Sequence, residues 1–257
     1  MADKPLSLKE FLDRKVAEYN QPAFILRDPI SVPHRFTQKQ DIEIAGFFAA
    51  ILAWGQRTTI INSVNRLMAW MDESPYAFIQ QHQESDLKPF VHFVHRTFNA
   101  TDLLYFLSVL QSFYQKHDSL EMAFQPKEMP MNMRQRLIYF QTQFFAGEHP
   151  ERTRKHVSTP ARNSACKRLN MYLRWMVRRD KQGVDFGLWQ NISPAELICP
   201  LDIHVSRVAH RLGLIATSKA NWVMAEQLTQ ALRTFDPIDP VQYDFALFGL
   251  GAEERIQ

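Results

Sequence analysis

The sequence predicts an all-α protein. Apolar residues recur every three or four positions through most of the 257-residue chain, which is the spacing that gives a helix one buried face. Only eight glycines are present, so the tight turns that join strands in an all-β fold are scarce. No segment alternates apolar and polar residues over the length of a strand. The chain length suits one large domain or two small helical lobes.

The predicted helices follow one another along the chain. Ser7 and Glu10 have the spacing of a capping box, which starts the first helix. Residues 42–54 are apolar nearly all round, which indicates a central buried helix that Gly55 ends. Pro75 suits the first turn of a shorter helix. The expected helices cover residues 7–19, 37–54, 60–71, a short segment from 74, 103–114, 118–121, 133–145, 164–179, 204–212, 221–235 and 240–248.

The helical pattern is interrupted near residues 125–132, where Pro126 and Pro130 lie close together. Because proline cannot continue a helix, this is the best candidate for a boundary between lobes. We therefore expect an N-terminal helical lobe over residues 1–125 and a C-terminal one over 126–257. The last helices are free to pack back on the first lobe.

Composition indicates a soluble cytoplasmic protein. Hydrophobic residues make up 46% of the chain and charged residues 22%, as in ordinary globular proteins. The chain starts with a charged segment rather than an apolar leader, and its longest apolar stretch is too short to span a bilayer. Cys166 and Cys199 are too few for a disulfide framework or a four-thiolate iron–sulfur site, so we expect reduced thiols.

Positive charge is concentrated between Glu151 and Lys181. This segment holds ten Lys or Arg and two acids, a local charge of +8 in a chain whose net charge is +3. Such a block is either a solvated face or, if gathered on one surface, an electrostatic footprint for phosphates.

Lys167 is the candidate nucleophile. It precedes the apolar stripe of the basic helix and lies near the start of that helix. The adjacent Arg168 and the positive helix end both disfavour protonation of an amine, which is one way to make a lysine nucleophilic. The alternative is a solvent-exposed lysine that meets a phosphate or nothing.

Asp202 is the candidate acid. It follows Pro200 and Leu201 and stands immediately before a predicted helix, where an aspartate commonly caps the backbone amides. A capping carboxylate is held rigidly and kept ionised by the helix dipole. The same properties suit a group that stabilises a cationic sugar or orients a nucleophile, so the two roles are compatible.

A third feature is the polar turn after the central helix. Trp54 and Gly55 end the apolar run, and Gln56 and Arg57 open onto the next helix. An exposed Gln-Arg pair at a helix N-terminus can meet phosphates or enter a duplex, although the same residues also suit a simple interhelical turn. Other chemistries lack their motifs: the sequence shows no metal site, no Gly-x-Ser-x-Gly elbow and no phosphate-cradling glycine loop.

Three segments resemble the helix-hairpin-helix DNA glycosylase superfamily. Residues 202–208 look like its Asp-x-His-hydrophobic-x-Arg-Val signature, and residues 51–58 look like its early Leu-Leu-x-x-Gln-x-Thr segment. Residues 243–251 are similar to its closing helix, where an acid precedes a Leu-Gly pair. Residues 167–172 most resemble the archaeal 8-oxoguanine glycosylase branch, whose Lys-x-Leu-Asn segment carries the nucleophile. The whole chain also looks like an uncharacterised bacterial family of conserved hypothetical proteins.

The resemblance implies two helical lobes around a cleft and a base-excision enzyme that acts on damaged double-stranded DNA, with an oxidised purine as the candidate base and with AP-lyase activity. It makes Lys167 and Asp202 catalytic, and it implies a monomer without cofactor, metal or iron–sulfur cluster. Trp54 and Asp244 are assigned to the pocket for the extruded base, and Gln56 fills the gap in the duplex. The further DNA contacts are assigned to Arg57, Arg162, Asn163, Ser164, Arg168, His204 and Arg207.

Two departures from the superfamily keep alternatives open. The usual Leu-Pro-Gly-x-Gly hairpin, whose amides hold a phosphate, is replaced by residues 158–164 without glycine, and such a nest is harder to form without residues of positive φ. The insertion over residues 180–199 either forms part of a pocket wall or blocks it. The alternatives are a non-catalytic nucleic-acid-binding protein with the same fold and a cytosolic scaffold whose basic helix contacts an acidic protein.

Overall fold

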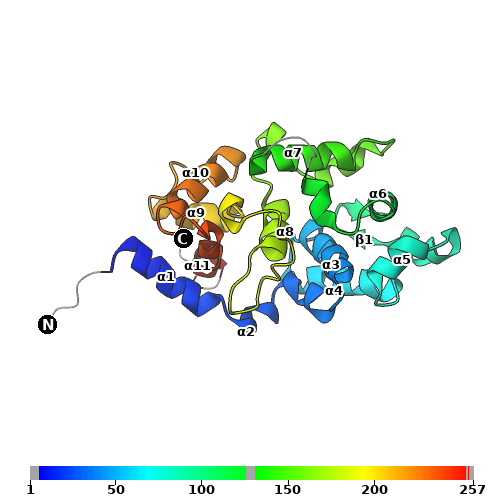
Figure 1. The fold of residues 1–257 in the computed structure, drawn as a ribbon, viewed down its shortest axis with the longest axis horizontal. Coiled ribbons are helices and arrows are strands. Elements are labelled where there is room, and N and C mark those ends of the chain that lie inside the picture. Colours follow the sequence, from blue (N-terminus) through cyan, green and yellow to red (C-terminus); the bar gives the residue numbers. More distant parts are fainter. Residues whose placement is uncertain (1–5, 126–130, 253, 255–257) are drawn as a thin grey trace. The chain divides into compact units, whose positions relative to one another are not determined.

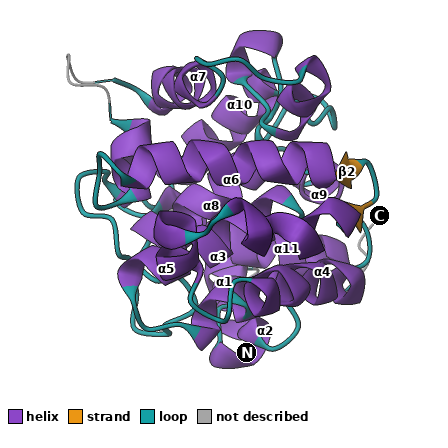
Figure 2. Cartoon of the chain, turned by 90° about the vertical axis from the view of Figure 1, so that its right-hand side faces the viewer, coloured by secondary structure: helices purple, strands orange, loops and turns teal. Residues whose placement is uncertain are grey.

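The computed structural model describes residues 6–125, 131–252 and 254. Helices account for most of this part of the chain, which confirms the all-α prediction (Figure 2). The exception is one short hairpin, in which β1 (Val94–His95) pairs antiparallel with β2 (Phe98–Asn99). Two residues per strand are too few to produce an alternating pattern in the sequence. No helix in the described ranges has both the length and the apolar character needed to cross a membrane.

The chain forms two compact units. Unit 1 comprises Met1–Phe24 and Thr159–Gln257, and unit 2 comprises Ile25–Ser158. The expected boundary at 125/126 adjoins residues 126–130, which lie outside the described residues, and the units divide the chain at other positions. Both ends of the chain contribute to unit 1 because the first helix packs against the last one.

Unit 1 is built around the packing of α1 (Leu8–Tyr19) on α11 (Tyr243–Ala252), which lie side by side in Figure 1. The capping box of Ser7 and Glu10 is present at the start of α1, as predicted. The α2 turn, Pro22–Ile25, leads out of this unit. The remaining elements of unit 1 are η6 (Pro160–Arg162), α8 (Lys167–Val177), η7 (Pro194–Glu196), α9 (Ile203–Arg211), α10 (Trp222–Arg233) and η8 (Pro240–Gln242).

Unit 2 surrounds α3 (Lys39–Ile51), which is buried on all sides from Asp41 onward and is therefore the central helix that its composition predicted. Within it, the buried carboxylate of Glu43 accepts hydrogen bonds from the Tyr114 hydroxyl at 2.9 Å and the Leu120 amide at 3.0 Å. The other elements of unit 2 are η1 (Pro29–Ser31), η2 (Pro33–Arg35), α4 (Arg57–Trp70), α5 (Pro75–Gln81), η3 (Glu84–His92), the hairpin, α6 (Ala100–Tyr114), η4 (Leu120–Phe124), α7 (Met133–Phe144) and η5 (Glu151–His156).

The close approach of α1 and α11 depends on Gly249. A Cβ atom at this position would lie 2.3 Å from Cδ2 of the Tyr19 ring, so the ring occupies the space that any side chain would need. The ring is also held from the other side, because its hydroxyl donates to Oε1 of Glu254 at 2.7 Å.

We expect Gly249→Ala to lower the free energy of unfolding by about 1–3 kcal/mol, because the added methyl group forces the two helices apart. Urea denaturation of the whole protein measures this change. Gly147→Ala is the matched control, since no atom lies within 4 Å of a Cβ at that glycine. Equal stability of Gly249→Ala and the unaltered protein would contradict the packing described.

Candidate functional site

The segment before α8 contains two residues with positive φ, although it has no glycine. Asn163 and Cys166 have φ of 56° and 48°, the left-handed region that usually favours glycine. Between them, the Ser164 hydroxyl accepts a hydrogen bond from the Cys166 amide at 3.2 Å. The positive φ values that a glycine hairpin would supply are thus supplied here by an asparagine and a cysteine. The left-handed Cys166 also starts α8 at Lys167, three residues later than predicted.

Lys167 is the first residue of α8, and its side chain is half-buried. Within the described part of the chain, its Nζ atom has no hydrogen bond and no ion pair within 4.0 Å. An amine at the positive end of a helix gains nothing from the helix dipole, and this one has no carboxylate in direct contact. It is therefore available for other interactions.

Asp202 is the N-cap of α9, as predicted. Its Oδ1 atom accepts hydrogen bonds from the backbone amides of His204 and Val205, each at 2.9 Å. Two such bonds fix the orientation of the carboxylate at the start of the helix. The side chain is half-buried, so it is not sealed in the core.

Asp244 lies in the first turn of α11 and is buried. Burial raises the pKa of the Asp244 carboxyl to about 6, and the negative charge of Asp202 adds to the rise. The positive charges of Arg174 and Lys167 act in the opposite direction. The start of α9 packs against the last turn of α11, because a Cβ atom at Gly251 would lie 3.2 Å from Cβ of His204.

Cys199 lies in the segment between η7 and α9, and its amide donates to the Thr229 hydroxyl at 3.0 Å. Its thiol is fully buried, and burial raises the thiol pKa well above its ordinary value. The negative charges of Asp244 and Asp202 raise the thiol pKa further, whereas Arg174 lowers it. The thiol therefore stays protonated and serves as a small packing group beside the carboxylates.

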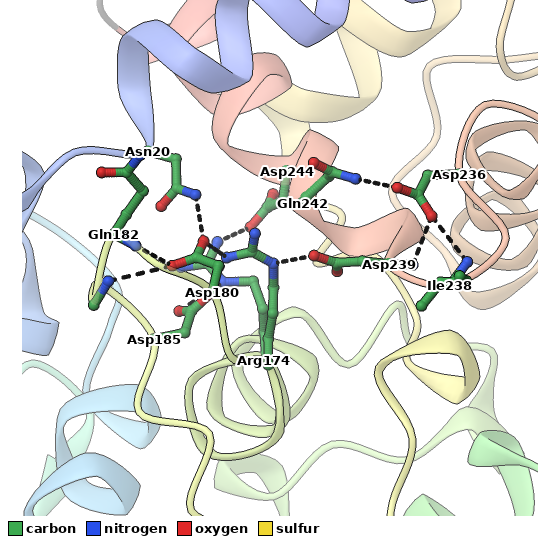
Figure 3. A network of polar contacts seen from close by, with 12 residues as sticks. Asn20, Arg174, Asp180, Gln182, Asp185, Asp236, Ile238, Asp239, Gln242 and Asp244 are labelled. Carbon is green, nitrogen blue, oxygen red and sulfur yellow. Dashed lines mark hydrogen bonds and ion pairs between the residues drawn. The ribbon is translucent and has the colours of Figure 1, made fainter.

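Arg174 holds Asp244 in position. Its guanidinium is 4% exposed, and Nη1 donates to Asp244 Oδ2 while Nε donates to Asp185 Oδ1 at 3.3 Å (Figure 3). The next arginine, Arg178, is the C-cap of α8, and it donates to Asp185 at 3.0 Å and to Asp239 at 2.8 Å. Two buried cations thus join α8 to acids on three other segments.

The insertion over residues 180–199 packs along α8. Asp185 in this segment is buried against the two arginines, and the Phe186 amide donates to the Trp175 carbonyl at 2.8 Å. Trp189 is 2% exposed and packs edge-on against Tyr172 with ring centroids 5.3 Å apart. The segment is therefore part of the core of unit 1.

The charge block is only partly a surface feature. Arg174 and Arg178, two of its ten cations, are buried and paired with acids. The prediction that the charge block forms a phosphate-binding surface is wrong for these two residues, because buried guanidinium groups cannot meet phosphates. Their i, i+4 spacing on the apolar face of α8, beside Tyr172 and Leu173, was a signal that they point into the protein.

The other predicted DNA contacts of unit 1 have varied surroundings. Arg162, Asn163, His204 and Arg207 are exposed, and Ser164 is half-buried and forms an isolated β-bridge with Asn221. Arg168 is half-buried, and burial lowers the pKa of its guanidinium to about 10, which leaves it charged at neutral pH.

Unit 2 carries the remaining predicted site residues. Gln56 is the exposed N-cap of α4, and Arg57, its first residue, is half-buried. Trp54 is half-buried, with the rings of His95 and His156 on it at centroid distances of 5.0 and 5.9 Å. No group of three or more His, Cys, Asp or Glu with the geometry of a metal site occurs in the described ranges.

The family of the chain is shown by its match to a family model described as a protein of unknown function (DUF2400), which covers residues 28–253. The chain belongs to this family. No curated protein and no solved structure matches the chain. The description of this family assigns no activity to it.

The buried Asp244 carboxyl makes the stability of the protein depend on pH. Its pKa is raised in the folded state to about 6, whereas the ordinary value of 3.8 applies to the unfolded chain. Between these values the folded state binds a proton that the unfolded chain has lost, so stability falls as pH rises from about 4 to about 6.

We therefore expect the difference in free energy of unfolding between the unaltered protein and Asp244→Asn to fall over this pH range, since Asn does not titrate. Urea denaturation of both proteins at pH 4.5, 5.5 and 7.0 measures the difference. A difference that stays constant across the three values would contradict the assignment of a buried titrating carboxyl.

Proposed function

We propose that the protein is a DNA base-excision glycosylase with AP-lyase activity, in which Lys167 is the nucleophile and Asp202 stabilises the cationic sugar. The observations that support the proposal are a half-buried Lys167 with no direct partner among the described residues and an Asp202 carboxylate held by two backbone amides, both in unit 1.

The side chains suit the two roles. Lys167 is without a direct partner in the described part of the chain, so its amine is available to attack. Asp202 is fixed by two backbone amides and remains half-buried rather than enclosed. A rigid, ionised carboxylate stabilises developing positive charge without reorganising during the reaction.

The reaction follows from these groups. The lone pair of the Lys167 amine attacks C1′ of the sugar, and the bond from C1′ to the base breaks with its electron pair leaving on the base. Asp202 stabilises the positive charge that develops on the sugar. Opening of the sugar ring then gives a Schiff base, from which β-elimination releases the 3′ phosphate. Neither step needs an oxidant or a metal ion.

Binding to the duplex is assigned to the exposed polar residues. Arg162, Asn163, Arg168 and Arg207 of unit 1 bind phosphates, with the amides around Ser164 beside them. Gln56 and Arg57 of unit 2 meet the duplex, and extrusion of the damaged base costs a few kcal/mol.

Borohydride trapping tests the nucleophile. We expect the unaltered protein to form a covalent adduct with duplexes that carry 8-oxoguanine or an abasic site, and Lys167→Gln to reduce this adduct to background. Lys219→Gln, at an exposed lysine of the same unit, is the control and keeps the adduct. Full adduct formation by Lys167→Gln would remove Lys167 from the mechanism. Duplex binding with no base release on a broad lesion panel would instead favour a non-catalytic nucleic-acid-binding protein.

Salt dependence tests the phosphate contacts. We expect the slope of log K against log salt concentration for duplex binding to become less steep by about 0.9 in Arg162→Ala, because one phosphate contact releases about one counterion. Arg211→Ala, at the C-terminal end of α9, is the control and leaves the slope unchanged. An unaltered slope in Arg162→Ala would place Arg162 away from the DNA.

A further inference from the structure

The hairpin of β1 and β2, orange in Figure 2, is fixed on unit 2 by its inward-facing side chains. Its register pairs His95 with Phe98, and both residues are buried. The His95 ring shares a hydrogen bond with the Ser63 hydroxyl at 2.9 Å, and the Phe98 ring packs edge-on against Phe106 with centroids 5.2 Å apart. Residues 96 and 97 form the turn between the strands and are exposed. The turn is therefore held in a defined position at the surface of this unit.

Three arginines meet at this hairpin. Arg66 on α4 donates from Nη2 to the Val94 carbonyl at 3.3 Å, and Arg152 on η5 donates from Nη2 to the Thr97 carbonyl at 2.9 Å. The third arginine, Arg96, is in the turn itself, and all three are exposed. Because Val94 and Thr97 are only three positions apart, the three cations are gathered around one turn of the chain.

Positive charge exceeds negative charge at the hairpin. Asp102, which is fully buried, pairs with Arg152 at 3.1 Å. Among the residues that the structure describes, no carboxylate lies within 4.0 Å of Arg66 or Arg96. The carboxylate of Glu151, the residue before Arg152, lies 3.8 Å from a histidine nitrogen instead. Three arginines and one paired carboxylate leave an excess of two positive charges.

The Arg66 side chain is held with one edge available. Its guanidinium lies over the rings of Trp70 and Phe93, with centroid distances of 5.4 and 5.0 Å. Contacts of this kind occupy the flat face of a guanidinium group, and they leave N–H groups at its edge for an anion. The ring contacts therefore position the cation without neutralising it.

Arg96 has a backbone conformation that arginine adopts at a cost. Its φ is 55°, and Gly, Asn and Asp are the residues that commonly fill such a position in a hairpin turn. Its side chain makes no hydrogen bond or ion pair within the described ranges. An exposed cation that is kept in an unfavourable conformation, without a partner of its own, points to a function for that side chain.

The Arg96 side chain also lies against the polar turn that leads to Gln56. A Cβ atom at Gly55 would lie 2.9 Å from Nη1 of Arg96 and 3.3 Å from its Cδ atom, so the arginine occupies space that only a glycine leaves open. Gly55 has a φ of 108°, which glycine adopts readily. The guanidinium is thus placed beside the residue that is proposed to enter the duplex.

We propose that the β1–β2 hairpin binds the DNA backbone beside the nucleotide whose place Gln56 takes, with Arg96 as the central phosphate contact and Arg66 next to it. The inference rests on the proposed function and adds the part of unit 2 that holds phosphates. A guanidinium group binds a phosphate through two parallel N–H donors. DNA is favoured over an acidic protein surface because a duplex that receives Gln56 brings its phosphates to the same turn.

Duplex binding tests the role of Arg96. We expect Arg96→Gln to weaken binding to an abasic-site duplex about tenfold at about 50 mM salt, because a charged hydrogen bond is lost. The slope of log K against log salt concentration becomes less steep by about 0.9. Arg134→Gln, at an exposed arginine of α7 in the same unit, is the matched control and keeps both values. Unaltered affinity and slope in Arg96→Gln would overturn the proposal.

A second variant separates binding from a structural role. We expect Arg96→Gly to lose binding as Arg96→Gln does, while its free energy of unfolding in urea is no lower than that of the unaltered protein. The reason is that glycine adopts positive φ without the cost that a side chain adds. A protein that is less stable in this variant, yet binds the duplex with its full affinity, would show that Arg96 serves the fold and not the DNA.

Competition distinguishes DNA from an acidic protein as the partner. Poly-glutamate, added at the same concentration of negative charge, is expected to displace the duplex poorly, because its carboxylates lack the fixed spacing of the phosphates along a duplex. Equal displacement by poly-glutamate, with the same dependence on Arg96, would assign the hairpin to an acidic protein and overturn the choice of DNA.

Disulfide cross-linking tests the position on the DNA. Cys166 and Cys199 are buried, so Arg96→Cys supplies an exposed thiol that a thiol tether on a single phosphate can capture. We expect cross-linking when the tether is beside the abasic site and little when it is one helical turn, about ten base pairs, away. Equal cross-linking at both positions would overturn the placement beside Gln56.

The outcomes keep this inference apart from the proposed function. If the unaltered protein forms no borohydride adduct but its duplex binding depends on Arg96, the glycosylase proposal fails and the hairpin contact stands. If a Lys167-dependent adduct forms and Arg96→Gln binds with unaltered affinity and slope, only the role of the hairpin fails.

Discussion

The ion pairs of Arg174 are the constraint on which the candidate site depends. The Arg174 guanidinium, in the core of unit 1, binds Asp244 on α11 and Asp185 in the insertion. Lys167 is the first residue of the same helix, α8. Removing one partner of a buried pair leaves an uncompensated charge and typically costs about 3–5 kcal/mol. The positions of α8, α11 and the insertion are therefore fixed together, and with them the surroundings of Lys167.

Three helix starts supply the chemistry of the site. Lys167 begins α8, Asp202 caps α9, and Asp244 lies in the first turn of α11. A helix start is positive, so it disfavours a protonated amine and favours an ionised carboxylate. Burial differs between the two acids: Asp202 is half-buried, whereas Asp244 is buried and its pKa is raised to about 6.

The turn over residues 163–166, before α8, has positive φ values although it contains no glycine. Glycine is the common choice where φ is positive, yet Asn163 and Cys166 occupy that region here. Their neighbours hold the turn in place: the Asn163 carbonyl accepts from the Trp222 amide at 3.2 Å, and the Ala165 carbonyl accepts from Asn170 at 3.0 Å. These hydrogen bonds therefore stabilise the positive-φ conformation in place of glycine, which adopts it most readily.

The sequence by itself determined the helical class, the capping roles of Ser7 and Asp202, and the buried character of the helix over residues 39–51. These follow from periodicity and from bonds between residues only a few positions apart. Only the tertiary structure decided that α1 shares a unit with the last helices, that Arg174 and Arg178 are buried, and that Asp244 pairs with Arg174. Asp244 and Asp239 lie 70 and 61 positions from the arginines that they pair with, and a local pattern carries no information about which distant partner will compensate a buried charge.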